Sequence, residues 1–275
     1  MKKGFTVTPF SFSRFYKIFK DLYPDKPVPK PSFLEWFIGF SEGDGCFMVN
    51  SRGSPVFIVT QSTKDIQVLW YIKENLGFGR VNKQGGSTHR FVVDGKFQII
   101  LIVYLFNGNL VFPKRVHTFS AFLKATNKKF KSSLRKPIQI IFREVYPTKN
   151  DLWFCGLTDA EGCFTCSLLG NSTAYRFRFI LAQKGEENKK ILEYFTQLFQ
   201  GQVSPHHNPN TYTFTVNGIR NSREILTYFG HSQLRTKKST SFWIWKNLSK
   251  DIRKGEHLNK KARKYLKFRS RLINK

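Results

Sequence analysis

The sequence predicts an α+β fold built from two similar halves, each combining helices with antiparallel strands. The first observation behind this prediction is an internal repeat: residues 36–47 return as residues 153–164, with six of the twelve positions identical. Self-similarity at a long spacing is typical of a duplicated structural unit. The second observation is the order of patterns in each copy, where a helical stretch precedes two strands, another helix, two further strands and more helices.

The strands are expected where apolar and polar residues alternate between turn signals. In the first copy, residues 46–49 and 56–60 flank the turn at residues 51–54, and a helical pattern follows at residues 66–76. In the second copy, residues 175–179 alternate and place Arg176 and Arg178 opposite the aromatic side chains, and residues 212–216 alternate in the same way. Such strands form antiparallel sheets with one apolar face and one polar, basic face.

The repeat continues beyond the twelve-residue motif at an offset that grows from 117 to 123 residues. The matched segments are residues 60–61 with 182–183, the helical patterns 66–76 with 189–199, the dipeptides 94–95 with 217–218, and residues 113–115 with 236–238. The two dipeptides are Asp-Gly and Asn-Gly, which are typical of hairpin turns. Matches in the same order along both halves indicate two copies of one fold.

We expect five segments along the chain. These are an N-terminal arm at residues 1–30, a first half-domain at 31–124, a linker at 125–149, a second half-domain at 150–250 and a basic C-terminal tail at 251–275. Residues 124–136 carry six basic residues and no acid, which indicates a linker or a basic helix end. The tail is either a solvated amphipathic helix or a phosphate-binding segment.

The net charge is +28, from 46 Lys and Arg against 18 Asp and Glu. Such an excess makes a compact chain repel itself, so a polyanionic partner such as nucleic acid explains it better than solubility alone. The longest apolar run, residues 99–106, is too short to span a membrane, and no membrane partner is expected. Cys163 and Cys166 have the spacing of half a zinc site, but they fall on a predicted strand and are better interpreted as buried free thiols.

Each copy of the motif is expected to be a helix that ends at its terminal glycine. Small residues lie four positions apart in both copies, at Gly39 and Gly43 and again at Gly156 and Ala160. Small residues at this spacing line one helix face and allow two backbones to approach closely. The two motif helices should therefore pack against each other across a pseudo-two-fold axis, with their carboxyl ends together.

Asp44 and Glu161 lie at these carboxyl ends. A carboxylate there opposes the helix dipole at a cost of about 0.3–1 kcal/mol, and two facing carboxylates also repel. A divalent cation removes both penalties, and Mg²⁺ prefers carboxylate and carbonyl oxygens, with water and phosphate completing its shell. One such motif more often marks a helix end than a site, but its recurrence with an acid at the same position favours a metal site.

Residues 37–45 and 154–162 resemble the two motifs of single-chain LAGLIDADG homing endonucleases, over about residues 33–248. The resemblance implies two half-domains paired through the motif helices, each with a four-stranded antiparallel saddle that lies in the DNA major groove and is backed by helices. It implies two or more Mg²⁺ ions held by Asp44 and Glu161, with the backbone carbonyls of Gly43 and Ala160 assisting. The departures from the family pattern, such as Glu161 in place of Asp, remove no ligand type.

The resemblance also implies a polar residue at the end of the second strand and a lysine near a later helix start, which organise water around the metals and offset phosphate charge. By local match these are Gln61, Gln183, Lys114 and Lys237, for each of which an ordinary surface role stays open. The candidates for base or phosphate contact are basic side chains on predicted strands, including the hairpin at residues 80–90. They are Arg80, Lys83, Arg90, Arg176 and Arg178.

The implied function is metal-dependent hydrolysis that makes a staggered double-strand break in a long, asymmetric duplex DNA target, performed by a monomer. Two alternatives share the fold: a maturase that binds its host intron RNA, and a DNA-binding regulator without catalysis. Retention of both acids argues against pure regulation, because a binder gains nothing from carboxylates that face DNA phosphates.

Composition indicates where the protein is encoded. Phe, Lys, Ile and Asn are abundant and only two Met occur, as AT-rich codons would produce. Together with the resemblance and a basic N-terminus, this favours a mitochondrial location and coding sequence. An AT-rich bacterial or nuclear genome would give the same bias.

Overall fold

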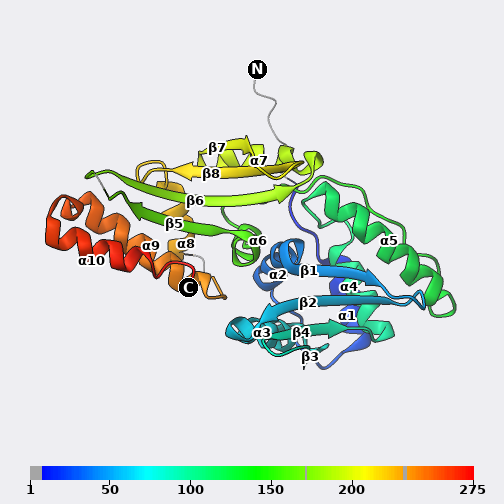
Figure 1. Cartoon of the computed structure of the whole chain (residues 1–275). Coiled ribbons are helices and arrows are strands. Elements are labelled where there is room, and N and C mark those ends of the chain that lie inside the picture. Colours follow the sequence, from blue (N-terminus) through cyan, green and yellow to red (C-terminus); the bar gives the residue numbers. More distant parts are fainter. Residues whose placement is uncertain (1–7, 171, 232–233) are drawn as a thin grey trace, which may run out of the picture. The chain divides into compact units, whose positions relative to one another are not determined.

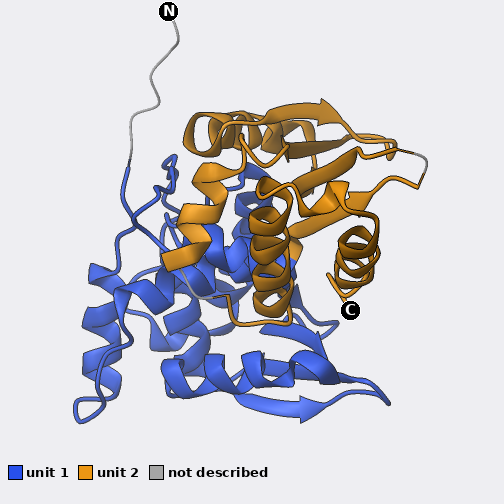
Figure 2. Ribbon diagram, turned by 90° about the vertical axis from the view of Figure 1, so that its left-hand side faces the viewer, with its two compact units in different colours: residues 1–160 blue, residues 161–275 orange. Residues whose placement is uncertain are grey.

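The computed structural model describes residues 8–170, 172–231 and 234–275 of the chain. The chain forms two compact units, unit 1 (Met1–Ala160) and unit 2 (Glu161–Lys275), coloured blue and orange in Figure 2. Each unit contains one four-stranded antiparallel sheet backed by helices, which confirms the expected α+β fold (Figure 1). None of the helices in these ranges is long and apolar enough to cross a membrane.

Unit 1 begins with a short helix, continues into the first motif helix and then builds its sheet. Its helices and strands are α1 (Ser13–Leu22), α2 (Pro31–Asp44), β1 (Gly45–Val49), β2 (Pro55–Ser62), α3 (Ile66–Leu76), β3 (Arg80–Lys83), β4 (Thr88–Val93), α4 (Lys96–Phe106), α5 (Pro113–Lys129) and α6 (Trp153–Glu161). Short 3₁₀ turns lie at Thr63–Asp65 and Lys131–Ser133. The second motif helix, α6, therefore belongs to unit 1 except for its last residue.

Unit 2 repeats the strand and helix order of unit 1 and adds a terminal helix. Its elements are β5 (Cys163–Leu168), β6 (Tyr175–Lys184), α7 (Glu186–Phe199), β7 (Gln202–Pro205), β8 (Thr211–Asn217), α8 (Arg223–His231), α9 (Lys238–Arg253), a 3₁₀ turn at Glu256–Leu258 and α10 (Lys260–Ser270). The strand order is β1-β2-β4-β3 in the first sheet and β5-β6-β8-β7 in the second. The same order in both sheets is the structural counterpart of the sequence repeat.

The two hydrophobic cores are built from aromatic residues at matching positions of the repeat. In unit 1 the ring of Phe47 lies 5.0 Å from that of Phe106, and in unit 2 the ring of Phe164 lies 5.6 Å from that of Phe229. Aromatic pairs at these centroid distances add about 0.5–1.5 kcal/mol to their burial. The complete sets are Phe47, Phe57, Phe106, Phe119 and Phe122 in unit 1, and Phe164, Phe179, Phe229, Phe242 and Trp245 in unit 2.

The predicted segments at the two ends of the chain both contain packed helices. Within residues 1–30, α1 buries Phe15 and Phe19. Within residues 251–275, α10 buries Leu266, and Arg263 on the same helix donates hydrogen bonds to the carbonyls of Leu169, Ser172 and Ala174 between β5 and β6. The basic C-terminal tail is thus an integral helix of unit 2, while the five expected segment boundaries stay predictions.

The two Gly-containing dipeptides predicted as hairpin turns are not hairpins. Asp94-Gly95 and Asn217-Gly218 instead end β4 and β8 and lead toward α4 and α8. Gly95 is the N-cap residue of α4, and Gly218 has a positive φ of 82°. The prediction was wrong because a dipeptide that tolerates an abrupt change of direction serves a strand-to-helix turn as well as a hairpin.

The two motif helices, α2 and α6, contact each other through their glycines. A Cβ atom at Gly39 would overlap the backbone carbonyl of Trp153, and one at Gly156 would overlap the backbone carbonyl of Trp36. These contacts are reciprocal, since each glycine faces the first residue of the other motif. The predicted close approach of two small-residue faces is confirmed at these two positions.

Reciprocal hydrogen bonds also join the two helices. The indole of Trp36 donates to the buried carboxylate of Asp159 at 2.9 Å, and the indole of Trp153 donates to that of Glu42 at 2.7 Å. The carboxylate of Glu42 also accepts from the backbone N–H groups of residues 111–112. Burial raises the pKa of Glu42 to about 7, although these hydrogen bonds and the charge of Arg115 act in the opposite direction. The first of the two acids in each motif, Glu42 or Asp159, therefore stabilises the helix pair.

Two further carboxyl groups lie at the amino-terminal ends of the motif helices. Asp151 accepts hydrogen bonds from the backbone N–H groups of Thr148 and Trp153, which caps α6. Glu35 of α2 accepts from the backbone N–H of Leu152 at 3.2 Å. Burial raises the pKa of Glu35 to about 7, helped by the negative charge of Asp151, and burial raises the pKa of Asp151 itself to about 6.

These raised pKa values predict a pH-dependent stability. An acid whose pKa is raised by folding stabilises the fold fully below its unfolded pKa, and that contribution is lost as pH rises through the folded pKa. Between about pH 5 and about pH 8, Glu35→Gln should therefore lose less free energy of unfolding than the wild type. Urea unfolding across this range tests it, with Glu74→Gln, which removes an exposed carboxylate from α3, as the control. Identical pH slopes for Glu35→Gln and the wild type would contradict the prediction.

Candidate metal and nucleic-acid site

Asp44 is the last residue of α2, directly before β1. The side-chain amide of Gln61 donates to its carboxylate at 2.5 Å. Gln61 reaches this position from β2, where it lies near the strand end and pairs with His89 of β4. The structure thus brings together two side chains that the sequence selected separately, one from the motif and one from the end of the second strand.

Arg115 of α5 binds the carbonyl groups at the end of the same helix. Its guanidinium donates to the backbone carbonyls of Ser41 at 2.5 Å and Gly45 at 2.6 Å, and reaches that of Gly43 at 3.4 Å. A cation at a helix carboxyl end offsets the negative end of the helix dipole. Arg115 therefore holds the backbone that carries Asp44.

Arg115 was not among the residues selected from the sequence. Its segment belongs to the repeat, but the predicted site residue there is the neighbouring Lys114, which lies at the start of α5. The available signal was that Arg115 is matched by Lys238, so both copies keep a cation at this position. Whether such a cation meets a phosphate or a backbone carbonyl depends on how α5 packs, which a local pattern does not contain.

In the second copy, Glu161 is the last residue of α6 and its side chain is exposed. Gln183 lies near the end of β6 and pairs with Tyr212 of β8, the same register position that Gln61 occupies in the first sheet. Lys237 is the exposed N-cap residue of α9. The structure places these residues at positions equivalent to Asp44, Gln61 and Lys114, but their roles stay predictions.

The groups around Asp44 fit a hard divalent cation. Asp44 supplies a partly exposed carboxylate, and Gly43 and Gly45 supply backbone carbonyls at the helix end. Oxygen donors of this kind suit Mg²⁺, which keeps part of its shell for water and phosphate. The guanidinium of Arg115 contacts Gly45 more closely than Gly43, so the carboxylate and the carbonyl of Gly43 are the donors best suited to a metal.

The sheet of unit 2 has one apolar and one polar face. Phe177 and Phe179 of β6 are buried, whereas Arg176 and Arg178 alternate with them and point to the other face. The strand register sets hydroxyl side chains beside both arginines on that face. The residues of this face include Thr165, Ser167, Arg176, Arg178, Ile180, Ala182, Thr213 and Thr215, so the face is polar except at Ile180 and Ala182.

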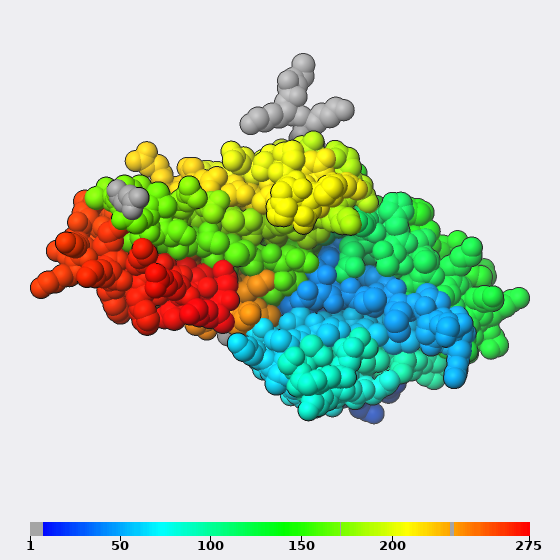
Figure 3. Space-filling model, in the orientation of Figure 1, coloured from blue at the N-terminus to red at the C-terminus, as the bar shows by residue number. Residues whose placement is uncertain are grey.

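The outer face of the unit 1 sheet is less uniformly polar. Arg80 and Arg90 share it with the hydrophobic cluster of Val56, Ile58 and Val92. The strands that carry this face, blue to cyan, are visible on the surface in Figure 3. Val56, Ile58 and Val92 are buried, so contacts from this face to base edges fall to its polar and basic side chains.

The three basic residues predicted on the β3–β4 hairpin differ in their surroundings. The guanidinium of Arg80 forms a bidentate ion pair with Asp94, at 2.5 and 2.6 Å, and this bond holds the pKa of Asp94 below its usual range. Lys83 alternates to the opposite face of the sheet from Arg80 and Arg90. Arg90 is therefore the hairpin residue best placed for a direct contact from the outer face.

The cysteines form no zinc site in the described part of the chain. Cys163 and Cys166 lie on opposite faces of β5, and all four cysteines are free thiols. Burial raises the pKa of Cys166 to about 12. Cys163 is half-buried and Cys46 is exposed, so the expectation of buried thiols is confirmed for Cys166 but wrong for Cys163.

Comparison with known proteins also divides the chain into two similar halves. The sequence model of the LAGLIDADG endonuclease family matches residues 37–126 and again residues 154–249. A probable intron-encoded endonuclease 4 from Neurospora crassa is 38% identical over 231 residues, which cover 82% of this chain and 41% of that protein. The chain thus spans about two fifths of the length of that relative.

Two other similarities concern a second relative and a solved structure. The intron-encoded RNA maturase bI4 of Saccharomyces cerevisiae is 28% identical over 149 residues, covering 54% of this chain and 20% of that protein. The crystal structure of the I-SmaMI LAGLIDADG homing endonuclease bound to cleaved DNA has a TM-score of 0.72 at 17% identity, covering 90% of this chain and 99% of that one. At this identity the structural match establishes the fold.

Proposed function

Since the chain belongs to the LAGLIDADG endonuclease family, we propose that it is a site-specific homing endonuclease that makes a staggered double-strand break in a long duplex DNA target. The observation that carries the proposal is the end of α2, where Asp44, Gln61 and the carbonyl of Gly43 offer hard oxygen donors and a water-binding amide. The equivalent positions of the second copy, Glu161, Gln183 and Ala160, supply the same kinds of group.

In this proposal Asp44 and Glu161, with the carbonyls of Gly43 and Ala160, hold two or more Mg²⁺ ions. Bound Mg²⁺ supplies an activated water for attack on phosphorus and offsets the negative charge that develops on the phosphate and on the leaving oxygen. The amides of Gln61 and Gln183 orient water by hydrogen bonds. Lys114 and Lys237 contribute positive charge against the phosphates, and Arg115 keeps the carboxylate of Asp44 in place by fixing the end of α2.

The polar faces of the two sheets are proposed to read the DNA in its major groove. Arg176 and Arg178 stand on a hydroxyl-rich face, where they can contact bases or phosphates. Arg90 is the corresponding candidate on the outer face of the unit 1 sheet, and Lys83 is a candidate for a phosphate contact from the opposite side of the β3–β4 hairpin. The guanidinium of Arg80 is held in its ion pair with Asp94. A DNA-bound structure with the same fold supports a duplex DNA partner, and we propose that the protein acts as a monomer.

Selection of cleaved molecules from a randomised duplex library tests this function. The purified chain with Mg²⁺ should enrich one long, asymmetric site, with both strands cut at staggered positions, and EDTA should abolish cleavage. Binding of one duplex sequence without cleavage at any Mg²⁺ concentration would instead identify a non-catalytic DNA-binding regulator. Cleavage that is unaffected by EDTA would exclude the metal-dependent mechanism.

A second candidate function is assistance of intron splicing, favoured by the similarity to an intron-encoded RNA maturase. The net charge of +28 suits intron RNA as well as DNA. The relatives are fungal intron-encoded proteins, so we propose that this chain is likewise encoded and used in a mitochondrion. Splicing of the intron that contains the reading frame of this protein, measured with and without the protein, separates this function from cleavage. One chain can perform both functions.

A further inference from the structure

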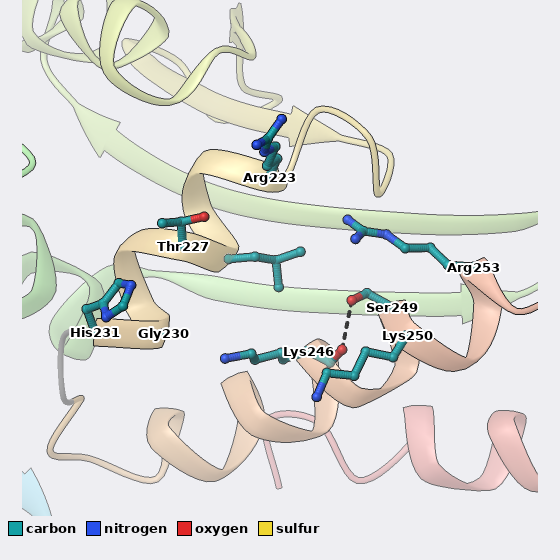
Figure 4. Close-up of a pocket in the computed structure, with 9 residues that line it drawn as sticks. Arg223, Thr227, Gly230, His231, Lys246, Ser249, Lys250 and Arg253 are labelled. Atoms are coloured by element: carbon teal, nitrogen blue, oxygen red, sulfur yellow. Dashed lines mark hydrogen bonds between the residues drawn. The ribbon is translucent and has the colours of Figure 1, made fainter.

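Unit 2 contains a groove between α8 and α9 that plays no part in the proposed cleavage site. It has a volume of about 380 Å³. Figure 4 shows the side chains that line it, with Arg223 and Thr227 on α8 and Lys246, Lys250 and Arg253 on α9. On both helices these residues recur at spacings of three, four or seven, so each set forms a stripe along one side of its helix.

The groove is strongly basic. Two lysines, two arginines and His231 line it, and no acidic residue is among its lining residues in the described part of unit 2. Asp251, the acid of α9, is instead bound by Arg269 of α10 at 2.5 Å. Like charges gathered in one concave site repel each other, which disfavours the arrangement unless an anion binds there.

In unit 1 the helices that correspond to α8 and α9 are α4 and α5, and a later segment of the chain is hydrogen-bonded to α5 and to the residue that ends α4. Asn127 exchanges two hydrogen bonds with the backbone of Ile138, at 2.8 and 2.9 Å. Asn107 likewise donates to the carbonyl of Gln139 and accepts from the N–H of Ile141, both at 2.8 Å. The backbone of residues 138–141 is therefore held beside this helix pair by two asparagine side chains.

The repeat thus provides an internal comparison of the two helix pairs. At the offset of 123 residues, Lys250 takes the place of Asn127 and Lys246 takes the place of the buried Leu123. One of the two amides that hold the backbone in unit 1, Asn127, is thus replaced by a cation, whereas Asn107 is matched by Gly230. The equivalent helix pairs therefore bind a stretch of backbone in unit 1 and line a cationic groove in unit 2.

An exposed aromatic side chain adds a second recognition element. Trp243 lies on α9, three residues before Lys246 and on the same stripe, and it is 49% exposed. The amine of Lys246 lies 4.6 Å from the centroid of its ring, so the indole stands at the edge of the groove. Aromatic side chains beside a basic groove are typical of proteins that bind single-stranded nucleic acid, because unpaired bases stack on the rings.

We propose that the α8–α9 groove binds one single-stranded nucleic-acid segment, with phosphates between Arg223, Lys246, Lys250 and Arg253 and a base stacked on Trp243. At about 380 Å³ the groove has room for part of one extended strand and not for a duplex. The aromatic platform favours nucleic acid over an acidic peptide, which offers no base to stack. The site lies on the helical layer of unit 2 and is independent of the residues that hold metal at α2 and α6.

Fluorescence anisotropy with short labelled oligonucleotides in EDTA tests the site without cleavage. RNA and DNA strands of the same sequence are compared, and tighter binding of one of them identifies whether the groove binds RNA or single-stranded DNA. The double variant Lys246→Gln/Lys250→Gln should weaken binding at least tenfold, and the salt dependence of log K should become shallower by about 0.7 for each phosphate that the variant no longer neutralises. Trp243→Ala should weaken binding at least fivefold, and Trp243→Phe should restore most of the affinity.

The matched control is Lys124→Gln/Lys128→Gln, which removes the same charge from exposed positions on α5. It should reduce single-strand binding less than twofold. All these variants should cleave duplex DNA at the wild-type rate, which also shows that they fold. The proposal is overturned if the groove variant binds single strands no more weakly than the α5 control, or if Trp243→Ala binds like the wild type.

Discussion

Asp44→Asn and Glu161→Gln should each reduce the rate of duplex cleavage by a factor of at least about 10²–10³ while the affinity for target DNA stays the same or increases. Each substitution keeps the size of the side chain and removes the negative charge that holds the metal. The DNA contacts assigned to the two sheets are unchanged, and removal of a carboxylate beside the phosphates reduces repulsion. Loss of catalysis with retained binding is therefore the signature of a metal ligand.

The measurement uses duplex target labelled separately on each strand, with cleavage and binding followed in parallel. Asp25→Asn and Glu193→Gln, which remove exposed carboxylates from unit 1 and unit 2, should cleave normally. Because one copy of the motif ends in Asp and the other in Glu, the two strands should be cut at different rates in the wild type. Normal cleavage by either site variant would disprove its assignment as a metal ligand.

Gly39→Ala and Gly156→Ala should produce the largest losses of stability. In each case the new methyl group would overlap a backbone carbonyl of the other motif helix, at Trp153 or Trp36. A flexible side chain could move aside, but a helix backbone moves only if the whole helix shifts, which would also stretch the two buried indole–carboxylate hydrogen bonds. We expect each variant to lose more than about 3 kcal/mol of unfolding free energy, the upper end for overpacked cores.

Urea or thermal unfolding measures this loss. Gly86→Ala is the matched control, because Gly86 lies in the β3–β4 turn and a Cβ there would meet nothing within 4 Å. A typical domain is stable by about 5–15 kcal/mol, so a loss of this size leaves a marginal fold. Gly39→Ala or Gly156→Ala within about 0.5 kcal/mol of Gly86→Ala would show that α2 and α6 separate at little cost.

Features that depend on local patterns were predictable from the sequence. The motif helix ends at Asp44 as its terminal glycine indicates, and α3 occupies residues 66–76, where the helical pattern lies. The alternation that set Arg176 and Arg178 apart from the aromatics is the alternation of β6. The repeat strengthened these predictions, because a pattern that occurs in both copies is less often accidental than one that occurs once.

Features that depend on how elements pack were not predictable. Arg115 reads as one more cation in a basic segment, and only the packing of α5 shows that it binds the end of α2. Arg80 and Asp94 are fourteen residues apart, and it is the β3–β4 pairing that allows their ion pair. The α8–α9 groove could not be predicted for the same reason. Its cations come from two helices, and each helix taken alone has the sequence of an ordinary amphipathic helix.

The position of α6 has a consequence for dividing the protein into two polypeptides. Its sequence belongs to the second repeat, but its residues up to Ala160 pack with unit 1, where they cover Gly39 of α2. A break within residues 125–149 would separate α2 from α6. Each fragment would then carry one of the two helices, and so only one partner of every glycine contact and every indole–carboxylate bond between them. The two bonds use different acids, because Trp36 bonds to Asp159 and Trp153 bonds to Glu42. Each fragment therefore matches the other fragment better than a second copy of itself. Fragments of this protein should accordingly reassemble as a heterodimer, and a chimera with a foreign second half would need a matching helix at this position.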